Sequence, residues 1–437
     1  MRSKTLLFLN ILWVFTILYF CTGRYEWNIP SYFTLIFYLV ICFGALNLGY
    51  FTGPKAKPQL VAEQKWEEDR KQIFYKYRRP FAFACIVTIF FQIMWVITFL
   101  GEFLILNVIE TLGENYFARM EAEFSEINHL MRIRTLTWVI TYFVFPMGMM
   151  FFKSMPLRYK ILFIVTVAIE ILASLNMGVS KNMGDLVIIG LAVMFLNGGK
   201  NPQEQIDLEK KKKQKGVFLR VAIILVIFFG AFSLVQNMRS EVSTSRENPY
   251  GYLAHIRSTT IYDYILGKGS AIGAAFDSMG TYISHAYCGL AYAMELPFEN
   301  TYGLGFSKAM MDYAESYFGI SGLVKHTYNF RLEDLYGWRN GQWWPTAFVW
   351  IGNAVSLWFV PLVTFLLGRF FAVVERRWYE QRQILCLVWF CQLMIAFIYL
   401  SCNAQIVQGR HILIATICLA LMYVVRYVFR FKFTWRK

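Results

Sequence analysis

Charged residues are scarce in this chain of 437 residues. Asp, Glu, Lys and Arg together make up 16% of it, whereas ordinary globular proteins contain roughly 25%. Hydrophobic residues make up 57%. A compact soluble protein of this length could not hide so much apolar surface in one or two cores. The shortage of charge therefore excludes a soluble enzyme, a disordered chain and a disulfide-stapled secreted domain.

Metal-binding and repeat patterns are also missing. The chain has eight cysteines but no CxxC pair and no Cys/His spacing typical of a zinc site. Nearly all of the cysteines lie in or beside apolar runs, where a free thiol behaves as a small apolar group. No repeat of about 20–50 residues is visible, and neither half of the chain mirrors the other, which argues against a transporter built from repeats.

Long apolar runs are abundant instead. Ten of them are nearly free of charge and approach the roughly 20 residues that a membrane-spanning helix needs. They are Leu6–Cys21, Tyr32–Phe51, Phe81–Leu100, Thr135–Phe152, Ile161–Ser180, Met183–Leu196, Val217–Gln236, Thr346–Phe370, Ile384–Cys402 and Ile412–Phe429. The first run is followed by no small-residue cleavage site, so we expect a signal anchor that is not removed. The sequence predicts an all-α polytopic membrane protein with about ten transmembrane helices.

The distribution of positive charge predicts the orientation. With the N-terminus in the cytoplasm, most of the 43 lysines and arginines fall on the cytoplasmic side, including the basic stretches Lys55–Arg79 and Lys210–Lys215. This is the positive-inside pattern, which basic loops beside anionic lipid produce. The net charge of +15 therefore reflects topology and does not indicate nucleic-acid binding. Both termini are expected to be cytoplasmic.

One connection is far longer than the others and faces outward in this topology. We expect residues 1–236 to form an N-terminal bundle of about seven spans, 237–344 a large outward loop, and 345–437 a C-terminal bundle of about three spans. The loop is rich in Tyr, Gly and apolar residues, so it should fold. All five histidines fall on the outer side or at an outer span end. Any chemistry is therefore expected outside, because long loops that fold are usually functional.

A polar stripe within this loop marks a candidate site. The residues Asp277, Thr281, His285, Cys288, Tyr292 and Glu295 are spaced three or four apart. On a helix over 275–295 they would fall within an arc of roughly 80° and line a cleft, opposite an apolar face. The competing interpretation is an amphipathic helix whose polar stripe simply faces water. The absence of Lys and Arg from the stripe argues against it.

Cations and intramembrane acids add further candidates. The expected outer surface carries Lys181, Arg239, Arg246, Arg257, Arg331, Arg339 and Arg410. Guanidinium groups bind pyrophosphate in bidentate fashion, although ordinary headgroup contacts or surface ion pairs would also account for these residues. Glu170 and Asp185 lie within predicted spans, where a carboxylate is either functional or hydrogen-bonded between helices. Asp185 is also spaced to pair with Lys181 four residues before it.

Several segments of the loop resemble one family. Residues 281–290 (TYISHAYCGL), followed by 295–298 (ELPF) and 301–305 (TYGLG), resemble the bacterial Wzy-type polymerases that join oligosaccharide repeat units into O-antigen or capsular polysaccharide. Residues 343–348 (WWPTAF) are similar to the aromatic segment that leads into a span in that group. Members often have Gly where Ala286 stands here. About ten spans with one or two large outward loops is also the family's layout.

The resemblance implies a GT-C-like membrane glycosyltransferase in a bacterial plasma (inner) membrane, with the large loop periplasmic or extracellular. The donor would be a glycan on undecaprenyl pyrophosphate and the acceptor a single lipid-linked repeat unit. Its partners would be these undecaprenyl-pyrophosphate-linked oligosaccharides and the lipid bilayer, with a chain-length regulator and a flippase by family analogy. No metal is expected, since the chain has no Asp-x-Asp motif. No cofactor and no nucleic acid are expected either.

The resemblance also suggests roles for the candidate residues. His285 would be the general base for the attacking hydroxyl, with Glu295 in reserve, and Arg257 would stabilise the leaving pyrophosphate. Pyrophosphate or substrate binding is expected of Lys181, Arg239, Arg246, Tyr292, His326, Arg331, Arg339 and Arg410.

Three other functions compete with the polymerase. A glycan ligase would use the same chemistry on another acceptor. A transporter or flippase of lipid-linked sugars would line several spans with polar residues, and the sequence places only Glu170 near mid-membrane. A membrane O-acyltransferase would need a histidine deep in a span, which no predicted span has.

Overall fold

In the computed structural model, the described residues are 4–54, 63–103, 129–197, 248–340, 342–427 and 429, without the side chains of 63–65, 131 and 271. Within them, seven helices are long and apolar enough to cross a membrane. They are α1 (Lys4–Thr22), α2 (Tyr32–Thr52), α3 (Glu63–Leu100), α5 (His129–Phe151), α6 (Leu157–Asn176), α15 (Val360–Gln381) and α17 (Arg410–Tyr427). The protein is therefore a mostly helical, polytopic membrane protein.

Three of the ten predicted spans are not among these seven helices. The sixth forms α7 (Lys181–Asn197) and the ninth α16 (Ile384–Ile398), which have 17 and 15 residues. At about 1.5 Å per residue they are shorter than a hydrocarbon layer of about 30 Å, so length alone does not establish either span. The seventh, Val217–Gln236, lies outside the described residues.

The prediction of one continuous eighth span was wrong. Residues 346–370 form two helices, α14 (Ala347–Val355) and α15, joined by the short 3-10 helix η5 (Leu357–Phe359). Ser356 adopts a positive φ of 70° between them. Pro361 explains the interruption, because it has no N–H to donate to the carbonyl of Leu357 four residues before it. That carbonyl accepts hydrogen bonds from the N–H of Val360 and, at 2.8 Å, from the hydroxyl of Tyr38.

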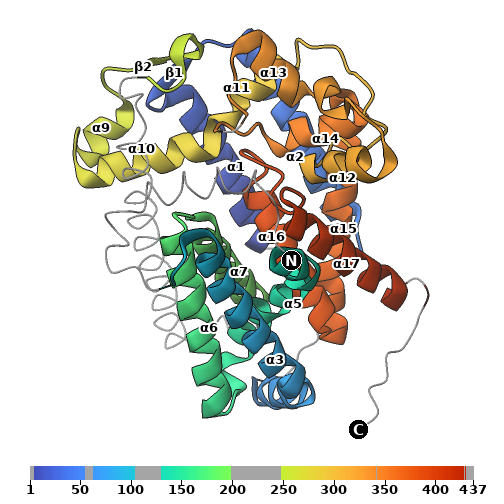
Figure 1. Ribbon diagram of the computed structural model, residues 1–437. Coiled ribbons are helices and arrows are strands. Elements are labelled where there is room, and N and C mark those ends of the chain that lie inside the picture. Colours follow the sequence, from blue (N-terminus) through green and yellow to red (C-terminus); the bar gives the residue numbers. More distant parts are fainter. Residues whose placement is uncertain are drawn as a thin grey trace.

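The elements between residue 248 and residue 336 gather at one end of the bundle, at the top of Figure 1, which we call the loop end. The helical ones are η3 (Gly251–Leu253), α9 (Ile261–Leu266), α10 (Ala271–Ser284), α11 (Ala286–Ala293), α12 (Lys308–Phe318), η4 (Leu323–His326) and α13 (Tyr328–Tyr336). Strand β2 (Ala254–Ile256) pairs antiparallel with β1 (Tyr25–Trp27), so that Glu26 faces His255. This ribbon ties the loop to the connection between α1 and α2.

Two helices approach unusually closely in the bundle. Small residues face each other where α2 crosses α15: a Cβ added to Gly49 would lie 1.9 Å from the carbonyl oxygen of Phe365, and one added to Gly368 would lie 2.0 Å from that of Leu46. In a membrane, such close backbone contact supplies much of the attraction between helices, because lipid is as apolar as the side chains. Gly49 and Gly368 therefore fix this crossing.

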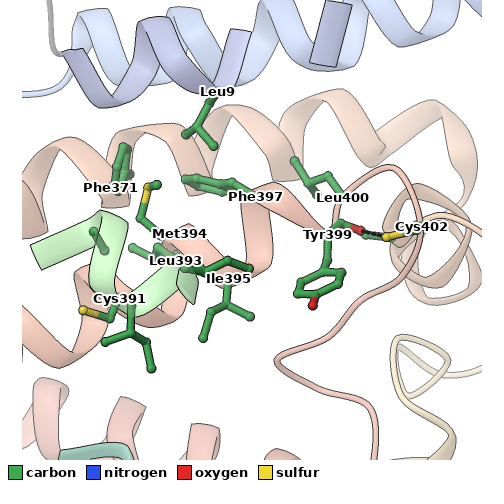
Figure 2. Close-up of a cluster of buried hydrophobic side chains, with 14 of the residues drawn as sticks. Leu9, Phe371, Cys391, Leu393, Met394, Ile395, Phe397, Tyr399, Leu400 and Cys402 are labelled. Atoms are coloured by element: carbon green, nitrogen blue, oxygen red, sulfur yellow. Dashed lines mark hydrogen bonds between the residues drawn. The ribbon is translucent and has the colours of Figure 1, made fainter. Parts of the chain in front are cut away.

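Helix α16 forms the centre of the bundle. Apart from Gln392 it is apolar, and it is buried around its whole circumference, as a core helix is and a lipid-facing helix is not. Figure 2 shows Leu9 of α1 above Phe397, and Phe371 of α15 beside Met394. These residues belong to one continuous core cluster that includes side chains from both halves of the chain.

Candidate functional site

A cavity lies among the helices near the loop end of the bundle. Its walls come from α5, α6, α7, α16 and α17 and from the connection between the last two. The cavity volume is about 70 Å³, room for several water molecules. Its polar lining consists of Trp138, Thr141, Tyr142, Glu170, Lys181, Asn182, Asp185, Gln392, Gln405 and His411. Carboxylates, amides, a lysine and aromatic rings thus meet in one place.

The helix ends give the depth of this cavity. Glu170 lies six residues before the last residue of α6, and Asp185 lies four residues after the first residue of α7. At about 1.5 Å per residue, these carboxylates lie about 9 and 6 Å inside the helix ends. His411 is the second residue of α17. The cavity therefore lies close to the membrane boundary at the loop end, and not at mid-membrane.

Asp185 has one carboxylate oxygen that can still accept a hydrogen bond. Its Oδ2 accepts a bond of 2.9 Å from Nζ of Lys181, as the spacing of four residues predicted. Its Oδ1 is buried and has no hydrogen-bond partner among the described residues. Buried polar atoms are nearly always hydrogen-bonded, so an oxygen left open beside a cavity indicates a place for a ligand hydroxyl or a water.

Glu170 is held more firmly. Gln92 Nε2 of α3 donates to its Oε2, and the side chain of Asn182 also bonds to it. The positive charge of Arg134 acts on the same carboxylate. That guanidinium lies over the rings of Trp95 and Trp138, 4.6 and 4.5 Å from their centres. Glu170 therefore joins α3, α5, α6 and α7, which agrees with the prediction of a carboxyl hydrogen-bonded between helices.

The loop reaches the rim of this cavity through the start of α17. Arg410 pairs with Asp312 of α12 at 3.7 Å, and the next residue, His411, packs edge-on against Trp138 with ring centres 4.8 Å apart. Ser307, just before α12, donates a hydrogen bond of 2.6 Å to the carbonyl of Val407. Of the predicted cations, Lys181 lines the cavity and Arg410 lies directly beside it.

His285 lies in a separate, aromatic environment. It is 7% exposed and stacks on Trp338 with ring centres 6.1 Å apart. Tyr250 is equally close on another side. Its Nδ1 lies 3.1 and 3.0 Å from the carbonyl oxygens of Thr281 and Tyr282, so Nδ1 carries the proton and Nε2 is the lone-pair nitrogen. Burial lowers the pKa of His285 to about 4, despite these two backbone contacts.

The continuous helix expected over 275–295 was wrong. It is two helices, α10 and α11, that meet at His285. The imidazole approaches the carbonyl of Tyr282, to which the N–H of Ala286 would bond in an uninterrupted helix, and such an inserted side chain kinks a helix. Cys288 is fully buried, so the polar stripe does not line an open cleft as a whole.

The remaining loop candidates, Tyr292, Glu295 and His326, do not line the cavity. Glu295 is exposed, and so is His326, whose Nδ1 lies 3.2 Å from the carbonyl oxygen of Asn300. The hydroxyl of Tyr292 donates to the carbonyl of Asn28 at 2.5 Å, and burial raises the pKa of Tyr292 to about 12. The hydrogen bond to Asn28 attaches α11 to the connection between α1 and α2 and gives Tyr292 a structural role.

The predicted arginines have partners of their own within the fold. Arg257 lies 3.8 Å from Glu26 and donates to the carbonyl of Cys21. Arg331 pairs with Glu299 at 3.0 Å and donates to the carbonyl of Pro297. Arg339 lies over the ring of Trp343, 5.6 Å from its centre. Arg239 and Arg246 lie outside the described residues. The ion-pair interpretation is therefore favoured for Arg257 and Arg331.

Tyr399 connects the cavity with the surroundings of His285. It follows α16 directly, and its ring points away from Leu9 (Figure 2). It lies close enough to both Asp185 and Tyr282 to interact with them electrostatically. Tyr282 in turn lies beside His285, with ring centres 6.4 Å apart. The cavity and the histidine are thus neighbouring parts of the loop end.

No family model, curated protein or solved structure matches this chain. Sequence reasoning found Glu170, Lys181 and Asp185 but missed the amides that complete the cavity, Asn182, Gln392 and Gln405, because a single amide in an apolar run carries no motif. Within the described residues, no group of three or more His, Cys, Asp or Glu side chains could hold a metal ion.

The buried histidine leads to a prediction about pH. A group whose pKa falls from 6.5 when unfolded to about 4 when folded favours the unfolded state once the solution can protonate it. Its stabilising effect is complete above pH 6.5 and is lost as the pH falls toward 4. Between pH 7 and pH 5 the folded state should lose about 2 kcal/mol from His285 alone.

Thermal unfolding of the protein in lipid nanodiscs at the two pH values measures this loss. The His285→Gln variant, which keeps a polar side chain but cannot take up the proton, should show a smaller drop in melting temperature between pH 7 and pH 5. An equal drop in the variant and the wild type would show that His285 is accessible to protons in the folded state.

Proposed function

We propose that the protein is a membrane-embedded glycosyltransferase that polymerises undecaprenyl-pyrophosphate-linked oligosaccharide repeat units on the outer face of a bacterial plasma membrane. The proposal combines the resemblance to Wzy-type polymerases with one structural observation: the open, buried Oδ1 of Asp185 at a polar cavity near the loop end of the bundle. The loop end is taken as the outer end, as the positive-inside pattern predicts.

The composition of the cavity supports a sugar as ligand. Carboxylates and side-chain amides accept and donate the hydrogen bonds that hydroxyl groups offer. Trp138 adds apolar surface to the cavity lining. The depth of 6 to 9 Å inside the helix ends, by the rise of about 1.5 Å per residue, suits a headgroup whose prenyl chain stays in the hydrocarbon layer.

The reaction joins a hydroxyl oxygen of the acceptor to the anomeric carbon of the donor. As this bond forms, the bond between that carbon and the pyrophosphate oxygen breaks, and the hydroxyl proton must leave. We assign Asp185 Oδ1 to accept the hydrogen bond of the attacking hydroxyl and then its proton. Lys181, and Arg410 beside the cavity, supply positive charge where the leaving pyrophosphate becomes more negative.

The roles expected of the loop residues remain part of the proposal. His285 is a second candidate for the base, since it is neutral at pH 7 and carries a lone pair on Nε2. Its low pKa makes it a weak base, and it lies in an aromatic cluster beside the cavity. Arg257 is committed to Glu26 and the backbone of α1, so we expect it to position the loop. Glu295 stays a reserve for His285.

One observation favours a second function. A flippase or transporter of lipid-linked sugars should carry polar residues on several spans, and polar side chains from α3, α5, α6 and α7 do meet at or beside the cavity, among them Gln92, Thr141 and Asn182. The sequence had placed only Glu170 near mid-membrane, and its position six residues before the end of α6 corrects this to a place near the loop end. The transporter is therefore a stronger alternative on the structure than on the sequence alone.

One experiment separates the alternatives. The purified protein in liposomes is given a synthetic lipid-pyrophosphate oligosaccharide with a fluorescent prenyl analogue. A polymerase yields a ladder of products that differ by one repeat unit. Movement of the labelled lipid between leaflets without chain growth would identify a flippase, and transfer onto a different acceptor a ligase. If none of these outcomes is seen when the repeat unit is that of the source organism, all three functions are contradicted.

A further inference from the structure

A group of large apolar side chains is exposed on elements that do not span the membrane. Ile261, Tyr264 and Ile265 of α9 and Ile272 of α10 are 60, 82, 71 and 69% exposed. We call these four residues the α9 patch. Such a gathering is unusual on a surface that meets only water and marks a site of contact.

The contacts beneath the patch fix its depth. Tyr262 of α9 stacks on Tyr19 of α1 with ring centres 5.3 Å apart, and its hydroxyl lies 3.0 Å from that of Thr22, the last residue of the span. Phe276 of α10 packs edge-on against Phe15, with ring centres 5.8 Å apart. Phe15 lies seven residues before the end of α1, about 10 Å at about 1.5 Å per residue.

Because α9 and α10 pack this far down α1, they cannot lie wholly outside the membrane. The headgroup layer on each side of the hydrocarbon core is only roughly 5–8 Å thick. Elements whose side chains pack against the last two turns of a span therefore lie at the boundary between headgroups and acyl chains. Figure 1 shows α10 crossing α1 at the loop end, with α9 at its outer side. Gly280 permits the crossing, since a Cβ there would lie 2.4 Å from the ring of Tyr19.

The patch also continues a surface that faces lipid. On α1, Leu7, Ile11, Val14 and Leu18 are more than half exposed and recur at spacings of three and four residues, which is one face of the helix. Lys268, between α9 and α10, is exposed beside the patch and carries the charge that anionic headgroups attract. Tyr264 has the apolar ring and polar tip typical of the membrane interface.

We propose that α9 and the first turn of α10 form an interfacial anchor whose apolar patch inserts into the leaflet at the loop end. Lipid acyl chains cover Ile261, Ile265 and Ile272, while Tyr264 and Lys268 meet the headgroups. Such an anchor holds α10, and with it the kink at His285, at a fixed height above the bundle. The proposal rests on the membrane-spanning helices and does not depend on any catalytic activity.

Photocrosslinking in lipid tests this anchor. The photoreactive amino acid p-benzoylphenylalanine replaces Ile265 in the full-length protein, which is reconstituted in liposomes of phosphatidylethanolamine and phosphatidylglycerol and irradiated. The same amino acid at Asp334, an exposed position on α13, is the matched control. Because both side chains are exposed, neither replacement should disturb folding, and an unchanged melting temperature checks this for each variant.

Mass spectrometry of the digested protein identifies what each position touches. We expect phospholipid adducts at position 265 to exceed those at 334 several-fold. Equal, low lipid labelling at both positions would overturn the proposal. So would a peptide adduct at 265, either to residues 217–236 of the same chain or between two copies, because the patch would then be a protein interface.

Discussion

Asparagine in place of Asp185 is expected to abolish chain elongation while leaving the fold intact. The exchange keeps the shape of the side chain and the hydrogen bond to Lys181, but the amide cannot take up the proton of an attacking hydroxyl. Loss of a positioned general base costs about 10²- to 10⁴-fold in rate. We therefore expect product ladders from Asp185→Asn to shorten to the unreacted repeat unit under conditions in which the wild type gives long chains.

The chain offers a close control for this variant. Glu380 pairs with Arg376 at 2.7 Å, again at a spacing of four residues, but the pair lies in the last two turns of α15, which does not line the cavity. Glu380→Gln removes a carboxylate from the same kind of ion pair and should retain nearly full activity. If Asp185→Asn polymerised as fast as Glu380→Gln, the carboxylate would have no part in the chemistry and the cavity would lose its main support as the active site.

Alanine at Gly368 should strongly destabilise the protein. The added Cβ would lie 2.0 Å from the carbonyl oxygen of Leu46 and 3.1 Å from the amide nitrogen of Tyr50, so the two backbones must separate. In soluble cores, overpacking of this kind lowers the free energy of unfolding by about 1–3 kcal/mol. The loss should be larger here, because the obstacle is rigid backbone. The expected result is a melting temperature several degrees lower in detergent or nanodiscs, with reduced yield of folded protein.

Two further variants make this test specific. Gly49→Ala, on the facing helix, should have a similar effect, because its Cβ would meet the backbone of Phe365 at 1.9 Å. Gly44→Ala lies on the same helix, α2, but an added Cβ meets nothing within 4 Å. Alanine there should be neutral or stabilising, since glycine is the poorer helix former. Equal destabilisation by all three variants would show that the α2–α15 crossing does not have this geometry.

The membrane-spanning helices could be predicted from the sequence because their signal is local. An apolar run of about 20 residues identifies a span without any knowledge of its neighbours. The break at Ser356 was missed although Pro361 gave a local warning, since the hydropathy of 346–370 is uniform on both sides of it. The tight crossing of α2 and α15 also had a signal, small residues four apart at Gly49 and Gly53 and at Gly368 and Ala372.

The site could be predicted only in part, because its residues come from distant parts of the chain. Glu170 and Asp185 stood out as acids in apolar runs. The partners of Glu170, Gln92 and Arg134, are 78 and 36 residues away from it in the sequence, and only the packing of the helices brings them together. The sequence identified His285 as a candidate general base. Its burial could not be predicted, because it depends on Trp338, which no local pattern connects with it.

The most direct test of the central claim asks where the sugar binds. A lipid-pyrophosphate oligosaccharide that carries a diazirine on its first sugar is added to the protein in liposomes, irradiated, and located by mass spectrometry, with unlabelled substrate as competitor. We predict adducts, suppressed by the competitor, on the segments of α5, α7 and α17 that contain Trp138, Asp185 and His411. Competed adducts confined to the loop, for example to 255–268 or 295–302, with none on these helices, would contradict the assignment of the cavity as the site.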